Sequence, residues 1–403
     1  MNVLFLTLVN ISSIHKSGLY EDLLREFTKN GHHVYVAAPV ERRFGEKTHL
    51  IQEDCGTILR IKTGNIQKTN FIEKGISTLT LEHAFIKAIK THFNNIKFDL
   101  VLYSTPPITL AGAVEYVKHR DGAQTYLLLK DIFPQNAVDL EMMKTQGPKS
   151  VIYWLFRKKE KQLYEISDFI GCMSPANIKF LLEHNPEIPQ EKVELCPNSV
   201  EPIDMSASEE QRRKIRRKYR LPEDKTVFLY GGNLGKPQGI PFLIDCVRSQ
   251  KRNQNVFFLV IGSGTEYEKL EEFAEKEPQD NFRLMRSLPK EEYDRLAAGC
   301  DVGMLFLDHR FTIPNFPSRL LDYMEAKLPV LAVTDPNTDV GTIAEENGFV
   351  WWCESDSTEK FSACIQSIDG TELGRMGENA YEYLKEHYSA ERCYNIINSH
   401  FLR

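Results

Sequence analysis

The sequence predicts an α/β protein with two doubly wound parallel sheets, and three observations lead to this prediction. Short runs of β-branched and aromatic residues recur at intervals that leave room for a helix, as in βαβ units. These runs are almost wholly apolar, as expected of strands covered by helices on both faces. The series breaks once near the middle and then starts again, which indicates two similar domains.

Six strands are expected in each half of the chain. Those of the first half are 3–7, 34–38, 100–104, 125–129, 169–173 and 193–195. Those of the second half are 227–230, 256–261, 282–285, 302–306, 330–333 and 350–352. The stretch 197–221 between them is polar and carries several prolines, so we place one domain at 1–200, a second at 201–385 and a terminal helix at 386–403.

Open parallel sheets bind ligands at the carboxyl ends of their strands, where the strand order reverses. Two such domains facing a cleft would present two ligand surfaces to each other. That arrangement suits a transferase with two substrates, although a fold does not by itself specify the chemistry.

Composition argues against several other classes of protein. The 403 residues hold 50 Lys and Arg against 56 Asp and Glu, a net charge of −6, which argues against a nucleic-acid binder. No apolar run reaches the about 18 residues of a membrane-spanning helix, and the first residues lack the basic start of a signal peptide. The eight cysteines form no C-x-x-C pair, and the histidines show no metal-ligand spacing. We therefore expect a cytoplasmic protein with reduced thiols and no metal.

A dense run of glycines follows the first strand of the second half, in Tyr230-Gly231-Gly232-Asn233-Leu234-Gly235-Lys236-Pro237-Gln238-Gly239. Glycines let backbone N–H groups come close to a phosphate, and the dipole of a following helix adds attraction for the anion. Gly262 and Gly264 follow the next strand and belong to the same edge of the sheet. The alternative is an ordinary tight turn between a strand and a helix.

The segment 313–330 predicts a second anion site. Pro317 restricts the chain before a helix, and Ser318 is the expected N-cap of that helix. The free amides there, with Arg319 beside them, would attract an anion, and Asp322 would accept hydrogen bonds from ribose hydroxyls. The alternative is an ordinary capped helix with a solvated arginine and aspartate.

Asp131 is the most notable polar residue of the first half, because it comes directly after a predicted buried strand. A carboxylate at the carboxyl end of such a strand is well placed to contact a ligand. The alternative is a carboxylate that caps the following turn.

Two basic stretches, 151–164 and 212–220, leave a peripheral contact with a membrane open. The first interleaves aromatic and cationic residues, as interfacial helices do. The second would attract anionic lipid through its charge. In both stretches the alternative is the solvated face of a helix.

Taken together, these segments resemble the bacterial family 4 glycosyltransferases of the GT-B fold. The subgroup they resemble builds O-antigen and capsule repeat units and is typified by N-acetylfucosaminyl transferases. The resemblance covers nearly the whole chain. It rests on Ser104-Thr105-Pro106-Pro107, Asp131-Ile132-Phe133-Pro134-Gln135, Pro197-Asn198, Gly232-Asn233-Leu234-Gly235 with Gln238-Gly239, and Pro317-Ser318-Arg319 followed by Asp322-Tyr323-Met324-Glu325-Ala326 and Pro329-Val330.

The resemblance implies two Rossmann-like domains and a retaining transfer from a nucleotide-diphosphate sugar, preferentially a UDP-sugar, held by the second domain. The acceptor would be a sugar on a polyprenyl diphosphate, or a soluble glycan, held by the first domain. The terminal helix would pack back toward the first domain. The reaction would serve synthesis of a surface polysaccharide such as lipopolysaccharide or capsule, at the inner face of the plasma membrane, without a metal or a cofactor.

The expected catalytic residues are Asp131, which would orient or deprotonate the acceptor hydroxyl, and Arg319, which would stabilise the departing diphosphate. Arg283 and Arg286 would contact the nucleotide base. The full set of expected donor-binding residues is Gly232, Asn233, Gly235, Lys236, Gln238, Gly262, Gly264, Arg283, Arg286, Pro317, Ser318 and Asp322. The residues expected on the acceptor side are Gly18, Tyr20, Thr105 and Pro134.

The chain departs from the family pattern at several places, and two of these departures concern the donor site. Asn233 and Gln238 stand where many members carry Arg and Lys in the phosphate loop. Many members also carry two glutamates with seven residues between them, and here the matching positions hold Pro314 and Asp322. Pro314 cannot act as an acid, so the usual acidic contact at that position is lacking.

Two other functions remain open. A UDP-sugar 2-epimerase on the same fold would be expected to bring more acidic and histidine residues into the cleft. A non-catalytic partner subunit would bind a nucleotide sugar without turning it over, and Pro314 is the observation in its favour.

Overall fold

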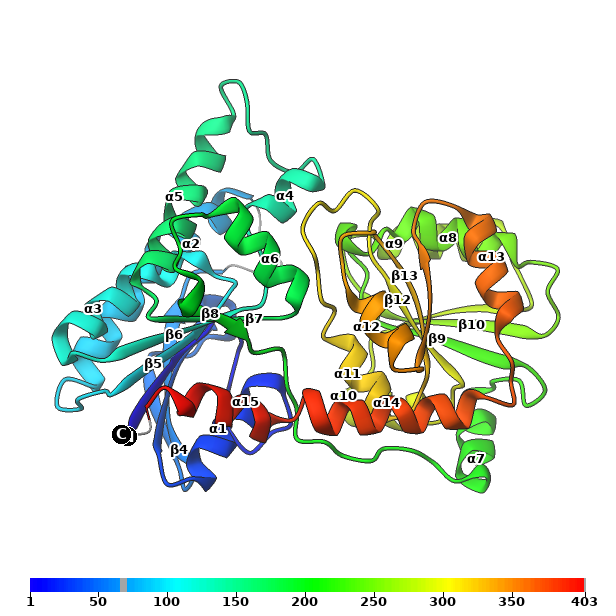
Figure 1. Ribbon diagram of the computed structural model, residues 1–403, viewed down its shortest axis with the longest axis horizontal. Helices are drawn as coiled ribbons and strands as arrows, with labels where there is room; N and C mark the ends of the chain where they lie inside the picture. Colours follow the sequence, from blue (N-terminus) through cyan, green and yellow to red (C-terminus); the bar gives the residue numbers. More distant parts are fainter. Residues whose placement is uncertain (66–70, 402–403) are drawn as a thin grey trace. The chain divides into compact units, whose positions relative to one another are not determined.

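The computed structural model describes residues 1–65 and 71–401, which form two compact units (Figure 1). Unit 1 comprises Met1–Glu201 together with Ala390–Arg403, and unit 2 comprises Pro202–Ser389. The chain thus leaves unit 1 one residue beyond the predicted boundary and returns to it at its end. The predicted terminal segment 386–403 includes Leu402 and Arg403, which lie outside the described residues.

The sheet of unit 1 has eight strands in the order β3-β4-β2-β1-β5-β6-β7-β8. β3 pairs with β4 in antiparallel fashion, and the other neighbouring strands of this sheet pair in parallel. The strand order reverses between β1 and β5, so the loops after these two strands flank the switch point. The strands are β1 (Asn2–Leu6), β2 (His33–Glu41), β3 (His49–Glu53), β4 (Gly56–Thr63), β5 (Leu100–Ser104), β6 (Gln124–Leu129), β7 (Phe169–Cys172) and β8 (Val193–Leu195).

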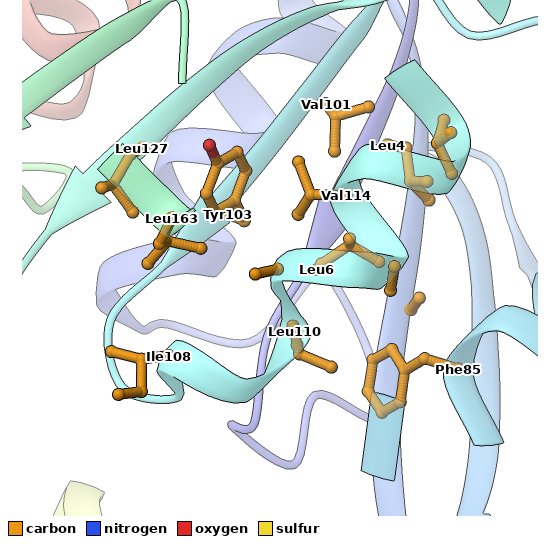
Figure 2. Packing of buried hydrophobic residues seen from close by; sticks show 14 of the residues in the cluster. Leu4, Leu6, Phe85, Val101, Tyr103, Ile108, Leu110, Val114, Leu127 and Leu163 are labelled. Carbon is orange, nitrogen blue, oxygen red and sulfur yellow. The ribbon is translucent and has the colours of Figure 1, made fainter. Parts of the chain in front are cut away.

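Helices cover both faces of this sheet. Figure 2 shows part of one core, in which Leu4, Leu6 and Val101 of the strands pack with Phe85 and Leu163 of the helices. On the other face, Phe27 and Tyr394 come from helices at opposite ends of the chain, and their rings meet edge to face at 4.9 Å. The helices of unit 1 are α1 (Leu19–Lys29), α2 (Phe71–His92), α3 (Ala111–Asp121), α4 (Gln135–Asp139), α5 (Ser150–Ile166), α6 (Pro175–His184) and α15 (Ala390–Ser399).

The sheet of unit 2 is parallel, with six strands in the order β11-β10-β9-β12-β13-β14. Its strand order reverses between β9 and β12. The strands are β9 (Thr226–Asn233), β10 (Val256–Ser263), β11 (Phe282–Arg286), β12 (Val302–Phe306), β13 (Val330–Thr334) and β14 (Val350–Glu354). The helices are α7 (Glu209–Tyr219), α8 (Ile240–Ser249), α9 (Tyr267–Lys276), α10 (Lys290–Ala297), α11 (Arg319–Glu325), α12 (Val340–Glu346), α13 (Thr358–Ser367) and α14 (Leu373–His387).

Each of the twelve predicted strands has a counterpart, and the predicted α/β class is confirmed. The β3–β4 hairpin has no counterpart among the predicted strands. The apolar run of β4 is interrupted by Arg60, a residue type that argues against a buried strand. The structure resolves this conflict, because Arg60 is 3% exposed and donates to the carbonyl of Ile11 at 2.8 Å.

Two further observations bear on the sequence predictions. Cys172, Cys196 and Cys353 are buried free thiols. Within residues 1–65 and 71–401, each helix is too short or too polar to cross a membrane.

Candidate functional site

The switch point of the unit 2 sheet is an opening between two strands. β9 and β12 pair through Phe228 with Val302 and through Leu229 with Gly303, and beyond these pairs the two strands diverge. The glycine-rich end of β9 lies on one side of the divergence. The segment that leaves β12 and leads into α11 lies on the other side, and it carries Arg319.

Tyr323 of α11 joins the two strands where their pairing stops. Its hydroxyl donates toward the carbonyls of Leu229, at 3.0 Å, and Met304, at 3.1 Å, and accepts from the N–H of Gly231 at 3.2 Å. Backbone groups that would otherwise lack a partner at the divergence are thereby satisfied. Tyr323 belongs to the family motif quoted above, but the sequence did not indicate this positioning role.

Arg319 places a positive charge at the switch point. Its guanidinium carbon stands 4.7 Å from the centre of the Tyr230 ring, in cation–π geometry. Among the described residues, no carboxylate lies within ion-pairing distance of this half-buried side chain. A cation held in a fixed place without a counter-charge is an anion-binding group.

Gly232 leaves room for that guanidinium. It has a positive φ of 113°, and a Cβ at this position would overlap Nη2 of Arg319. The neighbouring strand adds a second constraint, because a Cβ on Gly262 would overlap the carbonyl oxygen of Gly232. The two glycine runs predicted to share an edge of the sheet therefore pack backbone to backbone.

Gln238 holds the turn that follows β9. Its side-chain carbonyl accepts from the amide of Asn233 at 3.0 Å and from the N–H of Gly235 at 3.1 Å. Gly264 packs against the carbonyl of Leu234 on the other side of the turn. Lys236 is exposed on the same turn, and no carboxylate of the described chain pairs with it.

Asp322 forms an ion pair with a lysine of the neighbouring helix α10. Its carboxylate is 3.3 Å from Nζ of Lys290, which also pairs with Asp294 at 3.1 Å. Burial lowers the pKa of Lys290, but the two carboxylates outweigh that effect and raise it above its ordinary value.

The hydroxyl of Tyr293 is buried beside Gly231 and has no hydrogen-bond partner within the described chain.

Several expected donor residues have other contacts in the structure. Arg283 donates to the carbonyls of Tyr219, at 2.6 Å, and Arg220, at 3.0 Å, so it joins β11 to the end of α7. Arg286 lies over the Tyr267 ring at 3.8 Å and pairs with a glutamate of α9.

Ser318 occupies the N-cap position of α11, as predicted, but its side chain makes no capping hydrogen bond. Its backbone is already helical, with φ −61° and ψ −22°, whereas a capping side chain requires an extended backbone. Ser318 follows Pro317 at the start of the helix and is exposed.

In unit 1, Asp131 follows β6 and is held by two neighbours. The amide of Asn136 donates to both carboxylate oxygens, at 2.8 and 3.0 Å, and the hydroxyl of Thr105 accepts from the N–H of Asp131 at 3.1 Å. Burial raises the pKa of Asp131 to about 6, although the Asn136 hydrogen bonds act in the opposite direction. The carboxyl group therefore titrates just below neutral pH.

The other residues expected on the acceptor side follow neighbouring strands of the same sheet. Gly18 and Tyr20 lie at the start of α1, and burial raises the pKa of Tyr20 to about 12, so its hydroxyl is protonated at neutral pH. Pro134 precedes α4 in the segment that follows β6. Together with Thr105 after β5, these residues come from both sides of the β1–β5 switch point.

The basic stretch 212–220 is accounted for within unit 2. Arg212 and Arg216 of α7 both pair with Asp301, and Arg216 also donates to the carbonyl of Gly299. These charges hold the helix on the end of β12. Arg212 and Arg216 therefore differ from the alternative of a solvated helix face, whereas the exposed Arg213, Lys214, Arg217 and Lys218 agree with it.

Comparisons with known proteins agree with this architecture. Residues 211–383 match the family model Glycosyl transferases group 1. The chain is 24% identical over 370 residues to the probable glycosyltransferase WbjE of Pseudomonas aeruginosa, covering 88% of this chain and 89% of that protein.

Two solved structures illustrate the likeness in fold. Anabaena HepE in complex with UDP and glucose gives a TM-score of 0.70 at 12% identity, over 100% of this chain and 99% of that one. WaaG, a glycosyltransferase involved in lipopolysaccharide biosynthesis, gives 0.62 at 16% identity, over 98% and 99%. The chain therefore has the GT-B fold. Because its second unit also carries a glycosyl transferases group 1 domain, the protein is a glycosyltransferase.

Proposed function

We propose that the protein is a retaining glycosyltransferase that moves a sugar from a UDP-sugar to a glycan acceptor, lipid-linked in the cell, during synthesis of a bacterial surface polysaccharide. The observation that carries the donor half is the Arg319 guanidinium, which stands without a carboxylate partner at the switch point beside Gly232. The UDP and glucose bound to HepE support the choice of nucleotide, and the involvement of WaaG in lipopolysaccharide biosynthesis supports the polysaccharide context.

In this proposal unit 2 binds the diphosphate of the donor. Arg319 and Lys236 supply positive charge, and the backbone of the β9 turn supplies N–H groups without Cβ interference. Negative charge grows on the diphosphate as the sugar departs, so fixed cations stabilise the transition state more than the ground state. This charge stabilisation requires no metal ion.

The reacting sugar gains oxocarbenium character as the bond to the diphosphate breaks. The departing phosphate oxygen accepts the proton of the acceptor hydroxyl on the same face, and the new bond forms there with retention. Asp131 holds the acceptor in unit 1 and orients its hydroxyl by accepting a hydrogen bond from it, since its carboxylate is anionic at neutral pH and is itself fixed by Asn136.

Isothermal titration with UDP and a panel of UDP-sugars, in the presence of EDTA, tests the donor assignment. We expect UDP to bind with EDTA present and one UDP-sugar to be favoured. Absence of binding by UDP and every UDP-sugar would overturn the assignment. Binding followed by epimerisation of the free sugar nucleotide would indicate an epimerase, and binding without turnover on any acceptor would indicate a non-catalytic subunit.

Activity should fall as the pH drops below about 6, because Asp131 then takes up a proton and loses the anionic oxygen that accepts a hydrogen bond from the acceptor hydroxyl. Asp131→Asn is expected to lower kcat by about 10²–10⁴-fold and to remove this acidic limb. A pH profile of kcat from pH 5 to 8 measures both effects. The thermal unfolding midpoint of each sample, measured at each pH, shows that the protein is folded under the conditions of the assay. Asp369→Asn alters an exposed carboxylate and should keep the wild-type profile. An unchanged acidic limb in Asp131→Asn would remove Asp131 from this role.

We also propose that α5 docks on an anionic lipid surface. Val151, Trp154, Leu155 and Lys158 are spaced i, i+3, i+4 and i+7, so they share one face of the helix. The first three side chains are 60%, 59% and 62% exposed. Within the described chain Lys158 has no carboxylate partner. The residues that α5 buries, Glu160, Leu163 and Tyr164, lie on its other side.

Replacing both Trp154 and Leu155 with alanine should weaken binding to vesicles of anionic phospholipid by at least about tenfold, because each side chain contributes about 1.5–3 kcal/mol when it leaves water. Co-sedimentation with anionic and with neutral vesicles measures the change. Phe44→Ala removes another exposed aromatic side chain, elsewhere in unit 1, and should bind like the wild type. Equal sedimentation of the wild type and the double variant would contradict the assignment of α5.

A further inference from the structure

A group of potential metal ligands lies in unit 1, away from the residues discussed so far. His15 belongs to the loop between β1 and α1, Glu53 is the last residue of β3, and Cys55 lies in the turn between β3 and β4. One ligand atom from each of the three residues lies within 4.8 Å of the other two. Asp54 lies beside this group in the same turn, with Oδ1 at 2.7 Å from Nε2 of His15.

The distances fit a tetrahedral ion. Sγ of Cys55 lies 3.6 Å from Nε2 of His15 and 3.6 Å from Oε2 of Glu53. With a zinc–sulfur distance of about 2.3 Å and zinc–nitrogen and zinc–oxygen distances of about 2.1 Å, tetrahedral angles place sulfur about 3.6 Å from either atom. The His15–Asp54 separation is shorter than such a site requires. Asp54 is 84% exposed, so its side chain has room to withdraw.

Helix α1 holds both segments in place. Arg25 donates to the carbonyls of Ile14, at 2.8 Å, and Lys16, at 2.6 Å, on either side of His15. Thr28 donates to the carbonyl of Cys55 at 2.8 Å. The loop and the turn are therefore fixed against one helix before any ion binds.

The carboxylate of Glu53 is also oriented. The N–H of Ile14 donates to Oε2 at 2.8 Å, the same oxygen that faces the Cys55 sulfur. Hydrogen bonds of this kind orient the ligands of known metal sites.

We propose that His15, Glu53 and Cys55, with Asp54 as the fourth ligand, bind a Zn²⁺ ion. Thiolate and imidazole together favour zinc over the hard cations Mg²⁺ and Ca²⁺. On binding, the Cys55 thiol releases its proton to water and its sulfur coordinates the ion. The ion would tie the β3–β4 hairpin to the loop that ends at Gly18, and would act on stability and not on the transfer reaction.

No metal is expected from the sequence, because the spacing of these residues along the chain does not match a known set of metal ligands. His15 stands about forty residues before Cys55, and the hairpin that carries Cys55 was itself not predicted.

Zinc affinity of the chelator-stripped full chain, measured by competition with a chromophoric chelator, tests the proposal. We expect one high-affinity Zn²⁺ per chain. His15→Ala and Cys55→Ser should each weaken Zn²⁺ binding by more than about tenfold. Loss of a hydrogen bond to a metal ligand already weakens metal binding by about tenfold or more, and these variants remove a ligand itself. Cys364→Ser removes another half-buried free thiol and should leave the affinity unchanged.

Substitution with Co²⁺ provides a second readout that does not depend on affinity. A thiolate-to-cobalt charge-transfer band should appear in the wild type and in Cys364→Ser, and should be lost in Cys55→Ser. Absence of tight zinc binding, or a band that survives Cys55→Ser, would overturn the proposal.

Zinc should also raise the thermal midpoint of the wild type but not of Cys55→Ser. Removal of zinc should leave UDP binding unchanged. The zinc proposal and the donor-site proposal can therefore fail independently, and the two binding measurements distinguish these outcomes.

Discussion

Replacing Arg319 with alanine is expected to weaken UDP binding by about tenfold to a hundredfold, since a hydrogen bond to a charged group is worth about 1.5–3 kcal/mol. The guanidinium stands over the Tyr230 ring without a carboxylate partner in the described chain, so its charge is available to an anionic ligand. Turnover should fall further than binding, by about 10²–10³-fold, because the charge on the leaving diphosphate grows in the transition state. Titration with UDP and initial rates with the favoured UDP-sugar measure the two effects.

Two companion variants sharpen this test. Arg319→Lys keeps the charge but loses the planar fork of donors, so it should restore binding only in part. Arg248→Ala removes an arginine from an exposed ion pair with Glu277 in the same unit and should bind UDP like the wild type. If Arg319→Ala binds UDP and turns over like Arg248→Ala, Arg319 does not belong to the donor site.

Gly262→Ala is expected to destabilise unit 2 by about 1–3 kcal/mol and to weaken UDP binding as well. Gly262 lies opposite Gly232 in the β9–β10 pairing, and a Cβ there would overlap the carbonyl oxygen of Gly232. Because backbone atoms cannot move aside as a flexible side chain does, β9 must shift, and Gly232 shifts with it. Denaturant unfolding gives the stability change, and titration of the folded variant with UDP gives the change in affinity.

The matched control is Gly374→Ala. Gly374 lies near the start of α14, and nothing would lie within 4 Å of an added Cβ. Alanine favours a helix more than glycine does, so stability should stay level or rise slightly. Equal stability and equal UDP affinity of the two variants would show that the Gly232–Gly262 approach does not constrain the site.

The parts of the site that the sequence predicted are those encoded over a few neighbouring residues. The glycine run after β9 and the Pro317-Ser318-Arg319 segment each carry a local signal of turn or helix start, and Asp131 stands just after an apolar strand. The lack of a side-chain cap at Ser318 has a local origin too. Residue type favours a cap there, but the backbone had already entered the helix.

Tyr323 and Tyr293 were beyond such reasoning. In sequence both are aromatic residues of helices. Their hydroxyls reach the backbone of β9 and β12 only because α10 and α11 pack against these diverging strands. Arg60 shows the same dependence, because its burial in β4 becomes possible only through the carbonyl of Ile11, far away along the chain.

By itself the sequence determined the α/β class, the twelve strands of apolar and β-branched residues, the glycine turn and the charged residues beside it. These features depend on periodicity, turn chemistry and apolar burial, which act within one segment of the chain. Only the tertiary structure decided that Arg319 faces Gly232 without a counter-charge, and that His15 meets Cys55. Contacts between distant segments depend on how strands order and helices pack, and local residue preferences do not specify that arrangement.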